Sequence, residues 1–167
     1  DTATSTHIMR YVFRRNLADT AWLYDGSFLA LDASSLTSSE TIICRITFFN
    51  AAPPEAPAPP SGSGLSGGVY RRFEREDGLT LFDDELRIAI GYVESLLTGS
   101  EENLAIYHYS PAATGWIREK TSTVNAAHNY VWATRDHFTD FALFNEQAVA
   151  NLNNVIVYPN PFVPYDP

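Results

Sequence analysis

The sequence predicts an all-β protein, an antiparallel β-sandwich, and three observations lead to this fold class. Two-residue alternation of apolar and polar residues is common, whereas helical periodicity is scarce. Turn signals recur roughly every 8–15 residues, the spacing of strands in a sandwich or barrel. Hydrophobic residues make up 45% of the 167 residues, which is enough to bury a sizeable core.

The first half of the chain carries the clearest strand patterns. Residues 21–31, AWLYDGSFLAL, predict two short strands joined by a turn at Asp25–Gly26. In the polar stretch that follows, Asp32 is suited to cap one helical turn. Alternation in residues 41–49, TIICRITFF, predicts a half-buried strand. Its apolar face consists of Ile42, Cys44, Ile46 and Phe48.

Residues 51–64, AAPPEAPAPPSGSG, are rich in Pro, Gly and Ser. Prolines cannot donate to a sheet ladder, and a Ser/Gly tail is flexible. A domain boundary here would leave about 50 residues upstream, which is marginal for an independent fold. We therefore expect a long surface loop inside one sandwich domain of residues 1–150, with one core shared by both sides of the loop. Deletion of residues 1–50 should then unfold the remainder.

The second half of the chain predicts a meander of strands. Residues 67–76 and 86–93 are expected strands on either side of the Asp77–Gly78 turn and the acidic FDDE, residues 82–85. PAATG has the Pro and Gly of a hairpin loop. The remaining expected strands are residues 103–110, 115–122, 129–135 and 138–144.

Charge, length and cysteine content exclude several classes of function. The net charge of −9 argues against a nucleic-acid or anionic-membrane partner, and the apolar runs are too short for membrane insertion as a helix. The single cysteine, Cys44, cannot form an internal disulfide and is expected to be a buried small hydrophobic residue. Residues 1–15 lack a signal peptide, so we expect that it has been removed or that the chain is part of a longer protein.

An ordered set of short motifs runs through the second half of the chain. The segments are Val69–Phe73, Gly78–Asp84, Leu86–Tyr92, Tyr107–Tyr109, Thr114–Trp116 and His137–Leu143. Together they resemble a recurrent extracellular bacterial β-sandwich, similar to the domain shared by zonula-occludens proteins, ankyrins and netrin receptors. The resemblance covers about residues 28–144, although GLTLF has an extra residue before its aromatic side chain. It implies a secreted or surface-displayed protein.

The end of the chain differs in kind from the rest. VYPNPFVPYDP resembles the opening of C-terminal immunoglobulin-like modules on secreted bacterial proteins, some of which are type IX sorting signals or resemble the hook-capping protein's domain. The resemblance implies that residues 151–167 are a linker and the first strand of a truncated Ig-like module. A Pro-rich linker of no further consequence is the alternative.

His137-Phe138-Thr139 resembles the cleavage motif of self-cutting sandwiches. The resemblance implies that the Thr139 hydroxyl attacks the Phe138 carbonyl carbon, that His137 accepts the proton, and that water hydrolyses the ester. We place His137 and Thr139 on one face of a single strand, which puts them within reach of each other. The alternative, which we favour, is packing and hydrogen bonding at the sheet edge, with Thr139 in the ladder and the Phe138–Thr139 bond intact.

Two further groups of side chains have both a functional and a structural interpretation. Clustered carboxylates suit Ca²⁺, but their spacing matches no calcium loop, and the four histidines are too scattered for zinc. The carboxylates are Glu74, Glu76, Asp77, Asp83 and Asp84. Aromatic residues suit either a sugar-stacking face or a core, and we expect Trp116 and Trp132 to be buried between the sheets, each costing roughly 3–5 kcal/mol when changed to Ala. The accompanying tyrosines are Tyr107, Tyr109 and Tyr130.

The sequence contains no Ser-His-Asp order, phosphate loop or CxxC pair, so we expect no cofactor and no turnover enzyme. The favoured function is a structural spacer or interaction module of a secreted or surface-displayed bacterial protein, flanked by neighbouring domains. A single-turnover self-processing domain and a carbohydrate- or protein-binding module are the alternatives.

Overall fold

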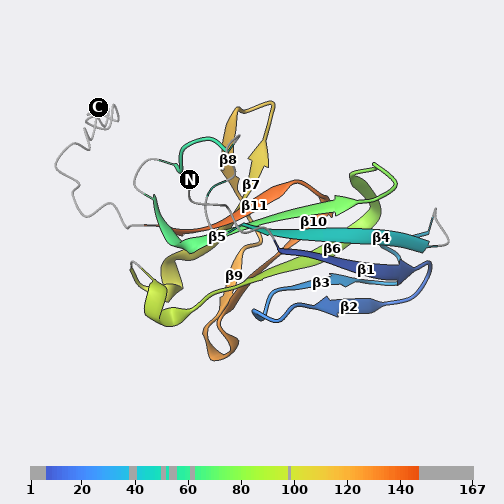
Figure 1. Cartoon of the computed structure of the whole chain (residues 1–167), viewed down its shortest axis with the longest axis horizontal. Coiled ribbons are helices and arrows are strands. Elements are labelled where there is room, and N and C mark those ends of the chain that lie inside the picture. The colour runs from blue at the N-terminus through green and yellow to red at the C-terminus, as the bar shows by residue number, and fades with distance from the viewer. Residues whose placement is uncertain are drawn as a thin grey trace, which may run out of the picture.

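A computed structural model describes residues 7–37, 41–49, 52, 56–60, 63–97 and 99–146, with the side chains of 63–68 left out. Two antiparallel sheets pack face to face, so the predicted all-β sandwich is confirmed. Figure 1 shows the two layers and the β7–β8 hairpin that projects from them. The expected start of an Ig-like module at 151–167 lies outside the described residues.

The larger sheet has six strands in the order β1-β4-β5-β11-β7-β8. They are β1 (His7–Arg14), β4 (Thr41–Phe49), β5 (Ser63–Arg75), β11 (Asp140–Glu146), β7 (Leu104–Ser110) and β8 (Gly115–Arg118). The five-stranded sheet has the order β2-β3-β6-β10-β9. Its strands are β2 (Asp19–Trp22), β3 (Phe28–Leu31), β6 (Leu81–Gly91), β10 (Tyr130–His137) and β9 (Thr123–Asn125). Short 3₁₀ turns are η1 (Glu94–Leu96), η2 (Glu101–Asn103) and η3 (Ala126–His128).

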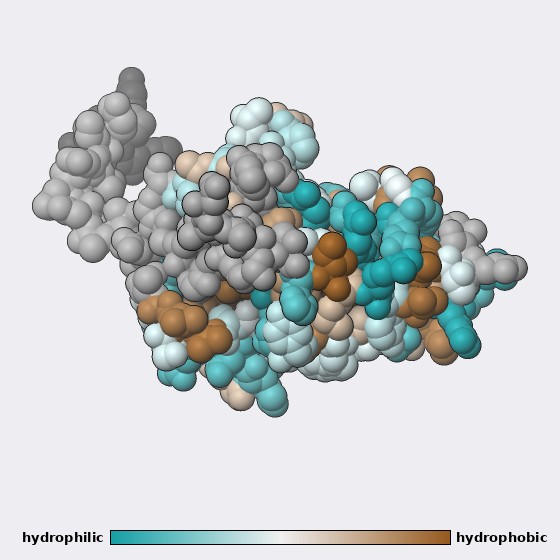
Figure 2. Space-filling model, viewed as in Figure 1, coloured by the Kyte–Doolittle hydropathy of each residue, from teal (hydrophilic) through white to brown (hydrophobic). Residues whose placement is uncertain are grey.

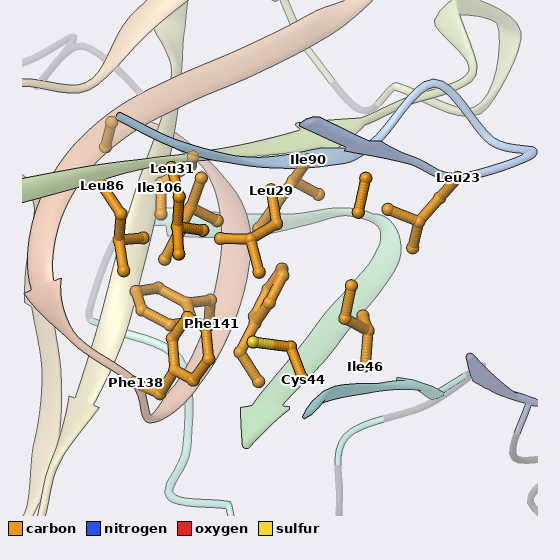
Figure 3. Close-up of a cluster of buried hydrophobic side chains, with 14 of the residues drawn as sticks. Leu23, Leu29, Leu31, Cys44, Ile46, Leu86, Ile90, Ile106, Phe138 and Phe141 are labelled. Carbon is orange, nitrogen blue, oxygen red and sulfur yellow. The ribbon is translucent and has the colours of Figure 1, made fainter. Parts of the chain in front are cut away.

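The core lies between the sheets and is built from the inward faces of alternating strands. Figure 3 shows Cys44 and Ile46 of β4 facing side chains of β3 and β6 such as Leu29 and Ile90. As expected, Cys44 is buried, and burial raises the pKa of its thiol to about 12. The buried cluster contains Phe13, Leu29 and Ile46 from before the Pro-rich segment and Phe73, Ile88 and Phe141 from after it.

The hairpin at Asp25–Gly26 forms as the sequence predicts. Gly26 has a φ of 82°, a left-handed value that favours glycine, and the Leu23 N–H donates to the Ser27 carbonyl at 2.9 Å. The turn packs so closely on β6 that a Cβ at Gly91 would overlap the Asp25 carbonyl oxygen. The Asp25 carboxylate pairs with Arg71 of β5 and thereby ties the hairpin to the other sheet.

Three local expectations need correction. FDDE is part of β6 rather than a turn: it lies in the irregular stretch between the pairs that Leu86 and Leu81 make with β10, where Phe82 is buried and the Asp83 N–H donates to the Ser35 carbonyl. Asp32 caps no helical turn, since its carbonyl accepts the Ser35 N–H at 3.0 Å in a turn and not in a helix. Strand β5 begins at Ser63, inside the stretch expected to be a loop, while residues 52 and 56–60 have no regular secondary structure.

Candidate functional site

The predicted cleavage tripeptide lies where the chain passes from one sheet to the other. His137 is the last residue of β10 in the five-stranded sheet, whereas Phe138 and Thr139 connect β10 to β11 in the six-stranded sheet. The expectation that His137 and Thr139 share one strand face is therefore wrong. The pairing of β10 with β6 becomes irregular between Arg135 and His137, and the chain leaves the sheet at this point.

Phe138 and Thr139 are both held by the surrounding strands. Phe138 is 3% exposed, its ring packs 4.7 Å from that of Phe82, and its N–H donates to the Thr80 carbonyl at 2.9 Å. The Thr139 hydroxyl donates to the Tyr109 carbonyl oxygen at 2.9 Å, so its proton points at β7. Thr139 immediately precedes β11, and its carbonyl accepts from the Phe73 N–H of β5 at 3.3 Å, which continues the pairing of Asp140 with Arg72.

The His137 imidazole contacts the two residues that precede it. Its Nδ1 lies 2.7 Å from the Asp136 carboxylate, and the hydrogen bond from His137 lowers the pKa of Asp136. The Arg135 guanidinium also touches the ring, with 3.2 Å between Nη2 and Nδ1. The predicted base His137 and the predicted nucleophile Thr139 therefore each contact other groups, and not each other, in this structure.

A hollow of about 320 Å³ adjoins the Phe138–Thr139 bond. Phe138, Thr139 and Leu79 line it together with charged side chains, and His137 is not among the lining residues. The charged groups are already paired, as Arg72 donates to Asp140 from Nε at 2.6 Å. The hollow has room for water beside the bond but is not lined by the predicted base.

A polar cluster joins the two sheets next to the crossover. His108 of β7 places Nδ1 2.7 Å from Oε1 of Glu119, and Arg135 of β10 places Nε 3.2 Å from the same oxygen. Glu119 is 4% exposed, and these close contacts are poorly aligned as hydrogen bonds. Arg135 also donates from Nη1 to Oε2 of Glu119 at 3.4 Å, so Glu119 contacts side chains that come from both sheets. His108 is a buried residue of β7, and its Nδ1 makes this close contact with Glu119 without an aligned hydrogen bond.

The five carboxylates considered for Ca²⁺ are distributed among separate partners. Arg10 and Arg45 pair with Glu76 and Glu74, and Arg75 pairs with Asp77. Asp83 accepts from Thr37 and Asp84 from the Glu85 N–H. Within the described residues, no group of three or more His, Cys, Asp or Glu side chains is placed to hold a metal ion.

The aromatic residues considered together in the sequence are divided between two opposite surfaces. Trp116, Tyr107 and Tyr109 lie in the six-stranded sheet, whereas Tyr130 and Trp132 lie in the five-stranded sheet. Trp116 and Trp132 are each only partly buried. The expectation that both are buried between the sheets is wrong, because each belongs to an outward face of its own sheet.

We call the group on the outer side of the six-stranded sheet the covered cluster. It consists of Phe49, Tyr70, Ala105, Tyr107, Ala142 and Phe144, with Trp116 packed against them. Tyr70 and Phe144 are 1% and 0% exposed although they face away from the main core. The Trp116 indole N–H donates to the Pro57 carbonyl at 3.1 Å, so the Pro-rich segment lies on this cluster.

We call Trp22, Phe28, Tyr130 and Trp132, on the outer side of the five-stranded sheet, the aromatic platform. Trp22 is opposite Phe28, Phe28 is opposite Ala89, and Ala89 is opposite Trp132, so these residues share one row across four strands. Trp22 is 60% exposed. Sequence reasoning missed Trp22, although alternation in AWL already placed it on the face opposite Ala21 and Leu23.

Contacts between side chains hold the platform together. The Trp22 and Phe28 rings lie 4.6 Å apart, and the Phe28 and Tyr130 rings lie 5.3 Å apart, edge to face. Arg87 stacks over Trp132 with its guanidinium carbon 4.9 Å from the ring centre. Such packing orders the rings before any ligand arrives.

Other exposed hydrophobic residues are more dispersed. Figure 2 shows hydrophobic side chains of the viewed face as separate groups among hydrophilic ones. The exposed residues include Ile8 and Val12 on β1, and Val93 and Leu96 in the β6–β7 connection. No helix in the described part of the chain is long and apolar enough to cross a membrane.

Neither a protein-family model nor a curated protein sequence matches the chain. The resemblance of residues 28–144 to the bacterial sandwich therefore stays a prediction that rests on the quoted motifs.

Proposed function

We propose that this chain is a structural and interaction module of a secreted or surface-displayed bacterial protein, which spaces neighbouring domains and presents a binding face. The observation that carries the proposal is the aromatic platform, a row of ordered rings on the outer side of a packed sandwich. Trp22 is 60% exposed, which favours recognition for its end of the row, whereas Phe28 is 6% exposed and packs within the fold. The extracellular setting comes from the resemblance of residues 28–144.

The arrangement around Phe138–Thr139 supports a module that does not cut itself. Thr139 donates its hydroxyl proton to the Tyr109 carbonyl, and His137 contacts Asp136 and Arg135. Amide attack also needs a twisted backbone. The left-handed φ values of non-glycine residues in the described chain fall at Asn16, Thr114 and Asn129, all in turns outside the tripeptide.

Self-processing is the second candidate, favoured by the hollow beside the Phe138–Thr139 bond. The intact mass of purified protein after prolonged incubation separates the two functions, and we expect the mass of the uncut chain. A fragment that begins at Thr139, and that disappears in both Thr139→Val and His137→Ala, would make self-processing the main function. Thr121→Val removes a hydroxyl elsewhere and is the matched control.

The extracellular setting needs a test of its own. Antibodies raised against this chain should label intact, unpermeabilised cells of the source bacterium or detect the protein in its culture medium. Signal only after cells are permeabilised, with an intracellular marker released in parallel, would contradict the proposed location.

A further inference from the structure

We propose that the aromatic platform binds an uncharged polysaccharide. The proposal rests on the proposed function as an extracellular module and names the ligand of its binding face. Its evidence lies in the order of the rings, the side chains between them, and the size of the surface.

The platform is long enough for several sugar rings, and its own rings are inclined to one another, by 51° between Trp22 and Phe28 and by 80° between Phe28 and Tyr130. Trp22 and Trp132 are in one row, three strand steps apart, which corresponds to about 14 Å across the sheet. Tyr130 lies in the next row, opposite Gly91, where the backbone of the Asp25–Gly26 turn packs against β6. Ala89 is 0% exposed and Phe28 is 6% exposed, so the rings accessible to a ligand are those of Trp22, Tyr130 and Trp132.

Apart from Arg87, the side chains around the rings are neutral and suited to hydroxyl groups. Thr123 is opposite Trp132, and Asn125 is opposite Tyr130 and donates to its hydroxyl at 2.8 Å. The row on the other side consists of Thr20, Ala30, Arg87 and Thr134. Arg87 is the single charged residue among these outward positions, and the chain carries a net charge of −9. The net negative charge of the chain opposes an anionic polymer and one arginine on the face offers it little in return, whereas a neutral polymer meets no such opposition.

Sugar rings match this composition better than a protein surface does. A pyranose has apolar C–H faces that stack on indole and phenol rings, and hydroxyl edges that bond to amides, hydroxyls and guanidinium groups. A stable protein interface needs about 20–30 residues a side and an apolar core. The three rows contain about a dozen outward residues and, besides the rings, no apolar side chain larger than that of alanine.

Affinity electrophoresis of the full 167-residue chain in gels that contain one polysaccharide tests the proposal. The probes are β-1,4-glucan, mixed-linkage β-glucan, xylan, mannan and α-1,4-glucan, with alginate as the anionic comparison. We expect slower migration with at least one neutral probe and none with alginate. Trp22→Ala combined with Trp132→Ala should weaken that binding at least about tenfold, as the loss of two stacking rings requires.

Trp116→Phe is the matched control, because it changes a tryptophan on the opposite surface and should leave binding unchanged. Circular dichroism of each variant shows whether it is folded, and Arg87→Gln gives a milder second test on the same face. No retardation by any neutral probe, retardation by alginate alone, or binding that survives loss of both tryptophans would overturn the proposal. If the chain forms a dimer that dissociates on Trp22→Ala, the proposal is also overturned, and the face is assigned to contact with a second copy of the chain. The intact-mass experiment tests separately whether the chain cuts itself. A negative result for polysaccharide binding therefore leaves the proposed structural role standing, and self-cleavage would leave the binding proposal standing.

Discussion

The two outer faces of this sandwich carry similar aromatic residues but differ in how far these residues are buried. In the covered cluster, Tyr70 and Phe144 are buried, and Trp116 binds a carbonyl of the Pro-rich segment. In the aromatic platform, Trp22 is 60% exposed and Trp132 is partly exposed, whereas Phe28 between them is only 6% exposed. The contrast teaches that an aromatic row on a sheet stabilises the fold only where chain lies over it. An open row is available to a ligand.

Phe144→Ala in the covered cluster should have the largest effect. The ring is 0% exposed and packs 5.1 Å from Tyr107 and 5.5 Å from Trp116, so its removal leaves a cavity. We expect a loss of about 3–5 kcal/mol in the free energy of unfolding, measured by urea denaturation. A loss below about 1 kcal/mol would mean that the covered cluster adds little to stability, and the comparison between the faces would collapse.

Trp116→Ala should cost about 1–3 kcal/mol, less than the 3–5 kcal/mol that full burial would imply. The ring is partly exposed, but it packs on Tyr70 and donates to Pro57. Trp116→Phe keeps most of the packing and loses the donor, so it should recover all but about 1 kcal/mol. If both substitutions cost the same, the hydrogen bond to the Pro-rich segment would account for the whole effect.

High pH should weaken the covered cluster through Tyr107. Burial, together with the hydrogen bond to Glu146, raises the pKa of Tyr107 to about 12, above the ordinary value of about 10. Below pH 10 the phenol is protonated in both states and its stabilisation is complete. Between pH 10 and 12 the unfolded chain loses the proton first, so the free energy of unfolding falls.

Comparison with Tyr107→Phe isolates this contribution. Burial also raises the pKa of Cys44 to about 12, but that thiol is present in both proteins and cancels in the difference. We expect the wild type to lose about 1 kcal/mol more than the variant between pH 10 and 12, in urea unfolding at each pH. Parallel stability curves would show that the Tyr107 phenol ionises as readily in the fold as out of it.

Local pattern was sufficient to predict strands but not the positions that depend on distant chain. Alternation in residues 41–49 and the Asp25–Gly26 turn predicted β4 and the β2–β3 hairpin. The same local reasoning placed His137 in one strand with Thr139. The alternation of apolar and polar residues continues through this region, so the sequence shows no sign that the chain crosses from one sheet to the other. What carries the chain across is an irregular pairing between β10 and β6, which only the fold defines.

The candidate site shows the same limit. Alternation puts Trp132 on the strand face opposite Val131 and Ala133, and this can be read from the sequence. Which other rings share that face depends on the register of β2, β3 and β6, which pair only in the folded chain. The cover on the opposite face includes Pro57, whose carbonyl accepts from Trp116. Pro57 belongs to a segment without apolar alternation, so the sequence does not predict this contact.

Trp22→Ala should have the smallest effect on stability, although it removes the largest type of side chain. Trp22 lies on the edge strand β2, is 60% exposed, and has its ring against Phe28 alone among the described aromatic residues. We expect a loss within about 1 kcal/mol in the same urea titration, because little apolar area leaves contact with the protein. Trp132→Ala should cost somewhat more, since Trp132 lies on an interior strand of the sheet and Arg87 packs on it. If Trp22→Ala instead cost as much as Phe144→Ala, the platform would be part of the folding core, and its rings would not be free to meet a ligand.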